Sequence, residues 1–406
     1  MVQWKLNLID PQTLAEVVVW LVTHILQNKI QQDPRFLSRF YRPTKYLNYD
    51  IAYLRSHYRD ESRALVDTPY SEMLLWLGES WDETVKRVKK TSVVVNPKRF
   101  RVISPIRELE TFRSEALREF KQDGKATFNG HAIRLSQVEE REEEICLHVQ
   151  PTRYYEQVKS NMVMDWEGPH SLQEVGIKTL RAYFVPEYGR KLPPLGDNRL
   201  ANTMGVSAIL YYRTTNGSTN GEIQYIPYLP RRVQLKPLTK DNKIVAVFDT
   251  GTFHCTASGV AEWLGSGEDY KDTPVLSFQD SFLRDMYREI EEEVGLRPED
   301  IEVLQPVALA REFLRGGKPQ LFFAGVTHLN EEALIQRRLK AIERTRRRSK
   351  NDPEVKIEIE DEHYLYTNKE NLENAIDQNG FSLEAVANLH YAEQFIQQYI
   401  TEGSTP

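Results

Sequence analysis

The stretch REIEEEVGL, residues 288–296, carries the most distinctive pattern of the chain. On a helix, Glu289, Glu292 and Glu293 lie at positions i, i+3 and i+4, so their three carboxylates share one face. Like charges on one face repel one another, and a hard divalent cation such as Mg²⁺, which takes carboxylate oxygens as ligands, offsets that repulsion. A solvated acidic surface is the commoner explanation of such a charge run, so the carboxylates alone leave both interpretations open.

The remaining residues of this stretch predict how the helix packs and where it ends. Ile290 and Val294 lie away from the acidic face and can pack inward. Gly295 suits the C-terminus of a helix, where a backbone with positive φ is common. The stretch therefore predicts a helix that buries one side, presents an acidic side and stops at Gly295.

The full string is more specific than the charge run within it. It fits the pattern R-E-U-x-E-E-x-G-U, with U an aliphatic residue, at every fixed position. Average residue usage gives roughly a 10⁻⁵ to 10⁻⁴ probability of a chance match in a chain of this length. The pattern is the signature helix of the Nudix hydrolase family, and the sequence resembles that family from about residue 200 to 400.

The longer Nudix pattern, G-x5-E-x7 before the signature helix, is matched only in part. Its Glu position holds Asp280, which keeps the carboxylate on a shorter side chain, and its Gly position holds Pro274. The stretch ASGVAE, residues 257–262, resembles the small-residue loop of the family and makes Gly259 the displaced glycine. An insertion of about 14 residues, around 263–277, then separates this loop from the helix.

The resemblance implies roles for individual residues. It implies Mg²⁺ as the cofactor, with Mn²⁺ as an alternative. Glu289, Glu292 and Glu293 are the implied ligands, Arg288 is their ion-pair partner, and the Gly259 carbonyl is a further ligand. Asp280, at the upstream Glu position of the family pattern, is a less direct counterpart of the family residue. The general base is Glu292, Glu293 or an acid outside the helix, and the outside candidates, which a solvated strand edge explains equally, are Glu358, Glu360, Asp361 and Glu362.

The stretch REFLRGGKP, residues 311–319, lies between two predicted strands just after the helix. In the family this region often lines the substrate pocket, so Arg311, Arg315 and Lys318 are candidates for contact with a phosphate or ribose. A polar hairpin with solvated basic residues is the structural alternative.

Length and element order predict an α/β protein of two domains. The 406 residues correspond to two or three domains at about 150 residues each. We expect a separate α+β N-terminal domain over 1–190, helical to about residue 90 and mixed after it. The Pro- and Gly-rich segment 184–199 is the expected linker, and 200–402 is the expected Nudix-like α/β/α sandwich with a mixed sheet.

Composition and charge exclude several classes of protein. Hydrophobic residues make up 40% and charged residues 28%, which excludes wholesale disorder, and a net charge of −6 excludes a globally basic surface. The run 337–350 holds eight Lys or Arg residues without interleaved aromatics, so its nucleic-acid signal is weak. The apolar run Leu14–Leu26 is shorter than the roughly 20 residues that span a membrane. It predicts a buried helix or one that docks on a membrane surface or a partner.

The cysteines and histidines predict no site. Cys146 and Cys255 form no disulfide framework and show no metal-ligand spacing, which favours a reducing, cytoplasmic setting. His254 has no ligand spacing either, and a His–Cys pair adjacent in sequence rarely faces itself, so we expect a packed histidine.

Two functions are compatible with this pattern. The first is Mg²⁺-dependent hydrolysis of a pyrophosphate bond in a nucleotide, or in a nucleoside diphosphate linked to another group, with the N-terminal domain restricting the substrate or recruiting a protein partner. The second is a nucleotide-binding sensor or adaptor with a Nudix fold and little turnover. The irregular upstream pattern favours the second, and the intact glutamates favour the first.

Overall fold

The computed structural model describes one compact unit that begins at Tyr46. The predicted helix Leu14–Leu26 and the acid Glu358 lie outside the described residues. Among the described residues, no helix combines the length and the apolar character needed to cross a membrane. The described residues are 46–403 except 66–67, 123–127, 142–143, 168–171, 173–174, 216–222, 233–250, 264–274, 352–358, 365–368 and 378–379.

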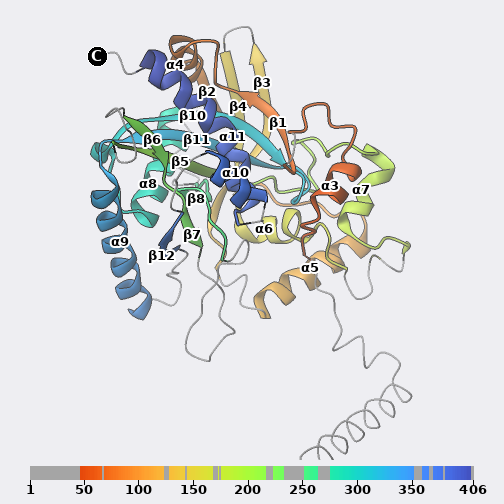
Figure 1. Cartoon of the computed structure of the whole chain (residues 1–406). Coiled ribbons are helices and arrows are strands. Elements are labelled where there is room, and N and C mark those ends of the chain that lie inside the picture. Colours follow the sequence, from red (N-terminus) through yellow and green to blue (C-terminus); the bar gives the residue numbers. More distant parts are fainter. Residues whose placement is uncertain are drawn as a thin grey trace, which may run out of the picture. The chain divides into compact units, whose positions relative to one another are not determined.

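The larger sheet is mixed and lies at the centre of this unit (Figure 1). Its main strands follow the order β1-β10-β11-β5-β6, and β8 also pairs with β5. The β11–β5 pair is parallel and the other pairs are antiparallel. The strands are β1 (Tyr70–Leu75), β5 (Gly205–Thr214), β6 (Gln224–Pro227), β8 (Ala257–Val260), β10 (Ile301–Glu312) and β11 (Lys318–Thr327).

Two smaller sheets accompany it. Four strands form the order β3-β4-β2-β9, in which β2 and β4 are parallel, and two strands form the pair β12-β7. The strands are β2 (Thr91–Val95), β3 (His131–Arg141), β4 (Glu144–Arg153), β9 (Val275–Ser277), β7 (Pro230–Arg232) and β12 (Ile359–His363).

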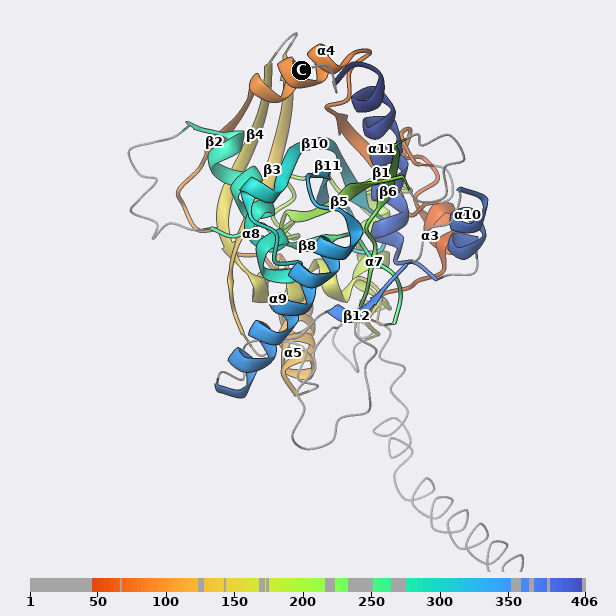
Figure 2. The ribbon, with the colours of Figure 1, turned by 60° about the vertical axis from the view of Figure 1, so that its left-hand side comes forward.

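Helices cover the two faces of the larger sheet. The α-helices are α3 (Ile51–His57), α4 (Trp81–Lys89), α5 (Arg107–Gln122), α6 (Tyr154–Val158), α7 (Leu180–Tyr188), α8 (Arg284–Glu293), α9 (Glu331–Asn351), α10 (Lys369–Asp377) and α11 (Leu383–Gln398). Figure 2 shows α8 and α11 on opposite sides of β5, β10 and β11.

Alternation along β5 explains the two layers. Val206 and Leu210 belong to a buried cluster with Ile290 of α8, whereas Ile209 belongs to a second cluster with Phe395 of α11. Successive strand residues point to opposite faces, so a strand with apolar residues at nearly every position is buried on both sides. The first cluster also holds residues of β2, β3 and β4, so the four-stranded sheet packs on the α8 side.

Residues 46–190 contribute strands to both larger sheets, which also contain strands from the rest of the chain. Strand β1 pairs with the edge of β10, and β2 pairs with β9, which directly precedes α8. The expected linker 184–199 lies inside the compact unit, and Leu192 and Leu195 within it are buried. The described part of the chain is thus a mixed α/β unit in which segments from both halves interleave.

Candidate functional site

The predicted acidic helix exists as α8 and packs as its pattern indicates. It spans Arg284–Glu293, and a π-helical turn, Gln279–Leu283, leads into it. Ile290 and Val294 are fully buried. Gly295 follows with φ of +79°, and a Cβ there would lie 2.7 Å from the Arg337 carbonyl oxygen. Both the buried side of the helix and its glycine stop are therefore confirmed.

Strand β8 lies against the acidic side of α8. A Cβ on Gly259 would overlap the Glu289 carboxylate, 2.5 Å from its Oε1, so only a glycine allows this approach. One residue earlier, the Ser258 N–H donates to Glu293 Oε2 at 2.9 Å. The side chain of Glu292 is 57% exposed. The fold thus brings Gly259 and the glutamates together across more than two dozen residues of sequence.

Arg288 supplies a positive charge within this group. Its guanidinium lies 3.0 Å from Glu289 Oε1, 3.3 Å from Glu262 Oε2 and 3.9 Å from Glu292 Oε1. Burial alone would lower the pKa of Arg288, but the charges of Glu289, Glu262 and Asp285 outweigh burial and raise the pKa above its usual value. Arg288 is therefore held in place as the ion-pair partner of the acidic side.

Asp285 is a member of this group that sequence reasoning missed. It lies one turn before Glu289, so Asp285, Glu289 and Glu293 line one face at spacings of four; we call these three residues and Glu292 the acidic stripe. Asp285 is 0% exposed, its Oδ2 accepts the Glu262 N–H at 3.1 Å, and its Oδ1 has no hydrogen-bond partner among the described residues. Burial, only partly offset by Arg288, raises its pKa to about 6.

Asp280, which occupies the upstream Glu position of the pattern, pairs elsewhere. Its carboxylate accepts the Ser277 hydroxyl at 2.5 Å, and its N–H donates to Ser277 Oγ at 3.0 Å. These contacts fix the turn that precedes α8. The structure thus places Asp280 in a local capping arrangement.

Of the three predicted substrate cations, Arg311 and Lys318 are buried and Arg315 is partly buried, and all three are engaged. Arg311 donates to the carbonyls of Gly317 and Pro193. Arg315 Nη1 donates to both carboxylate oxygens of Glu312, to Oε1 at 2.9 Å and to Oε2 at 2.7 Å. Lys318 Nζ lies 3.0 Å from Gln320 Oε1.

Strand geometry places Lys318 across the sheet from the acidic stripe. Val206 pairs with Gly259 and Gly205 pairs with Val260, so Gly205 and Gly259 face opposite sides. A Cβ on Gly205 would overlap Lys318 and Gln320, whereas one on Gly259 would overlap Glu289. Glu312 lies opposite Lys318 in the β10–β11 register, so the Glu312–Arg315 pair shares the Lys318 side.

The other predicted residues either make structural contacts or lie outside the described part of the chain. Within the basic run, Arg337 pairs with Asp300 at 2.9 Å and Arg338 donates to the Tyr228 hydroxyl at 2.9 Å. Glu360, Asp361 and Glu362 lie on β12, but their side chains are outside the described part of the chain, so none is placed as a general base.

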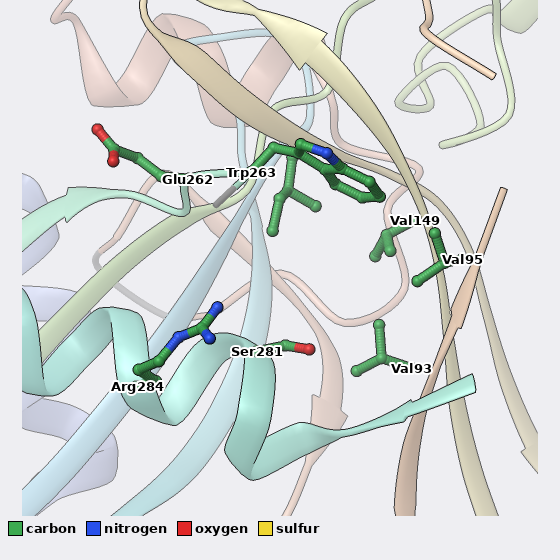
Figure 3. A pocket seen from close by; sticks show the side chains of 8 residues that line it. Val93, Val95, Val149, Glu262, Trp263, Ser281 and Arg284 are labelled. Carbon is green, nitrogen blue, oxygen red and sulfur yellow. The ribbon is translucent and has the colours of Figure 1, made fainter. Parts of the chain in front are cut away.

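A small pocket lies beside the start of α8 (Figure 3). Its volume is about 10 Å³, roughly the room that one water molecule needs. Figure 3 shows Val93, Val95 and Val149 on one side of the pocket, with Glu262 and Arg284 on the other. Because Glu262 pairs with Arg288, this apolar recess adjoins the acidic stripe.

Comparison with known proteins adds no family or relative: no family model matches the chain, and no curated protein matches it.

Proposed function

We propose that this chain is a Mg²⁺- or Mn²⁺-dependent hydrolase that cleaves a pyrophosphate bond in a nucleotide or in a nucleoside diphosphate linked to another group. One observation carries the proposal: the signature string folds as a helix whose acidic stripe lies against the glycine backbone of β8. The resemblance to Nudix hydrolases implies that arrangement. The mixed sheet, with α8 and α11 on opposite faces, supports a Nudix-like sandwich.

The donor type of the acidic stripe suits a hard divalent cation, and its carboxylates would have to converge on the ion, because no three of them lie within 4.8 Å of one another in the described structure. All side-chain donors in the acidic stripe are carboxylate oxygens, the ligand type that Mg²⁺ prefers. Asp285 Oδ1 is buried without a hydrogen-bond partner in the described structure, and Gly259 leaves room for the Glu289 carboxylate. Glu289, Glu292 and Glu293 would hold the ion, with the Gly259 carbonyl beside them.

The chain's own residues have separable roles in this reaction. When bound, the metal supplies charge neutralisation of the pyrophosphate oxygens and a water of lowered pKa. Glu292 is the most exposed member of the stripe and is the candidate to accept the water proton. Glu293 is oriented by the Ser258 N–H, and Arg288 orients Glu289. Hydrolysis adds one water molecule across the cleaved P–O–P bond, so that each of the two products ends in a phosphate group.

Residues 46–190 supply the part of the site that restricts the substrate. Val93, Val95, Ile133 and Val149 of the four-stranded sheet line the recess beside α8, which favours an apolar portion of the linked group. We also propose that this region recruits a protein partner.

The test is a substrate panel assayed with Mg²⁺ and Mn²⁺. Nucleoside triphosphates and nucleoside diphosphates linked to sugars, nucleosides or alcohols are incubated with the full chain, and released phosphate or monophosphate is measured. We expect Glu292→Gln to lose at least about 100-fold in kcat. Glu291→Gln is the matched control, because Glu291 is exposed on the same helix but outside the acidic stripe. Absence of turnover on every substrate with either metal would overturn the proposal.

A nucleotide sensor with little turnover is the second candidate. Asp280 engages Ser277, and Pro274 replaces the upstream glycine, so the pattern is incomplete where the family loop precedes the helix. Nucleotide binding measured by calorimetry, with no product formed over hours, would favour this function.

A further inference from the structure

A second group of metal-ligating side chains lies on the other face of β8. His254 and Cys255, which precede β8, meet Glu384 from the first turn of α11. One ligand atom of each residue lies within 4.8 Å of the ligand atoms of the other two. Among the described residues, this is the one group of three His, Cys, Asp or Glu side chains with that spacing. His254 is 3% exposed and Cys255 is 0% exposed. We call these three residues the His254 cluster.

Backbone contacts fix the cluster from two distant segments. The His254 N–H donates to the Pro230 carbonyl at 2.8 Å, which ties residue 254 to β7. Ser382 caps the N-terminus of α11 by accepting the Ala385 N–H at 3.1 Å, which sets the position of Glu384. The ligand atoms therefore meet through the fold, about 130 residues apart in sequence.

Two serine hydroxyls hold the His254 ring in place. Its Nδ1 contacts Ser382 Oγ and its Nε2 lies 2.9 Å from Ser258 Oγ. A metal bound through one nitrogen would replace one of these hydroxyls, and the other would fix the ring orientation, as outer partners of ligating histidines do.

A buried polar atom beside the cluster lacks a partner. Asn388 is 0% exposed, its Nδ2 lies 3.8 Å from Cys255 Sγ and 3.4 Å from Ser207 Oγ, and its Oδ1 makes no hydrogen bond within the described residues. Buried polar atoms without partners are rare and call for a ligand or bound water. This orphan oxygen is independent of the cluster spacing, and it belongs to the side chain whose Nδ2 contacts Cys255.

We infer that His254, Cys255 and Glu384 form a binding site for a thiophilic divalent transition metal of the zinc class, distinct from the acidic stripe. Nitrogen, sulfur and oxygen donors together select such metals over Mg²⁺, which takes oxygen ligands. Three protein ligands leave a fourth position for water or another ligand beside Asn388.

The charges are compatible with this assignment. Metal binding forms an S–metal bond at Cys255 and releases the thiol proton to solvent, so the thiolate and the Glu384 carboxylate supply two negative charges for a divalent ion. Of the three cations that face Glu384, Arg315 is already paired with Glu312; the others are Arg232 and Lys318. The ion and its two anionic ligands thus sum to zero charge, with Arg232 and Lys318 as two neighbouring positive charges.

Cobalt(II) is the probe that tests the site, because a cobalt–thiolate bond gives a charge-transfer absorption that oxygen ligands do not. We expect the full chain to bind one equivalent of Co²⁺ with this band and to retain one equivalent of Zn²⁺, measured by mass spectrometry, after dialysis. Cys255→Ser should abolish the band. Cys146→Ser is the matched control and should keep it.

Two further variants keep the outcome decisive. Glu384→Gln preserves an oxygen for the contact with Gln320, and should weaken Co²⁺ binding by about tenfold or more if Cys255→Ser does not fold. Glu292→Gln should leave the cobalt band unchanged, which separates this site from the proposed hydrolysis. A folded wild-type chain that shows no thiolate band, or a Cys255→Ser chain that keeps it, would overturn the inference.

Discussion

The two faces of β8 carry different chemistry only one residue apart. Gly259 faces the acidic stripe, where oxygen ligands are partly exposed and Arg288 supplies a counter-charge. Ser258 faces the His254 cluster, where the nitrogen and sulfur ligands belong to buried residues and Glu384, which supplies the oxygen, is partly buried. Strand alternation alone separates these environments. The comparison teaches that one short strand can present two ligand sets of opposite preference, which we propose as two cation sites.

The largest expected effect comes from filling the space at Gly259. Gly259→Ala places a methyl group against the Glu289 carboxylate, so either that side chain or β8 must move. We expect proposed hydrolysis to fall about 100-fold, as misplacement of a catalytic group by about 1 Å does. The cobalt–thiolate band on the other face should persist, and steady-state kinetics with absorption spectra measure both.

Gly196→Ala is the control for that substitution. Its Cβ would meet the nearest atom, the Ser136 carbonyl oxygen, at an ordinary 3.7 Å. If Gly259→Ala kept full activity, the close approach of β8 to α8 would have no part in the reaction.

The next effect concerns the pH dependence of stability on the acidic side. The pKa of Asp285 is about 6 in the fold against an ordinary 3.8, so its ionised form destabilises the folded state. This penalty is absent below the unfolded pKa, grows as pH rises between the two values and is complete above pH 6. Two pKa units correspond to nearly 3 kcal/mol, which relaxation reduces to about 2 kcal/mol.

Asp285→Asn should therefore stabilise the metal-free chain at pH 7 by about 2 kcal/mol and flatten the fall in stability between pH 4 and 6. Urea unfolding across this pH range measures the effect. Equal stability of both chains at pH 7, with unchanged slopes, would contradict a pKa that burial raises at this position.

A smaller effect is expected from the matching glycine on the other face. Gly205→Ala would displace Gln320, whose Nε2 donates to Glu384 Oε1 at 2.9 Å. We expect Co²⁺ binding to weaken about tenfold through this outer contact. Titration of the charge-transfer band measures the change. Hydrolysis should fall less than in Gly259→Ala, and the reverse ranking would show that the two faces are not separate.

The smallest effect is expected where the faces meet, at Ser258. Ser258→Ala keeps the backbone N–H that donates to Glu293 but removes the hydroxyl that contacts His254 and Arg232. We expect a change of about fivefold or less in Co²⁺ affinity, because the hydrogen bond to the His254 ring contributes about 1 kcal/mol or less. Hydrolysis should stay within the same range. A loss of either property by 100-fold would mean that Ser258 couples the two sites.

Local pattern predicted the acidic helix, because all its determinants lie within nine residues. The buried side at Ile290 and Val294 and the positive φ of Gly295 follow from helical periodicity and glycine conformational freedom. Asp285 was also visible as a carboxylate four residues before Glu289, but it lies outside the string and its burial depends on the packing of β8 and α8.

Long-range pairing explains what the sequence did not reveal. The contact of Glu384 with His254 and Cys255 depends on how α11 lies over the sheet, and no local spacing encodes it. The pairing of β1 with β10 and of β2 with β9 likewise joins segments about 180 or more residues apart. A domain count from length assumes that contacts cluster along the chain, and here they do not.

The β1–β10 pair has a consequence for biogenesis. During translation β1 leaves the ribosome long before its partner, whose first residue is more than two hundred positions later. At about 5–20 residues per second, that interval is roughly 10–40 s. Tyr70 and Leu74, which are buried in the finished sheet, stay uncovered by β10 during this time. The edge of the larger sheet is therefore completed only after most of the chain has been synthesised, because its earliest strand pairs with one of its latest.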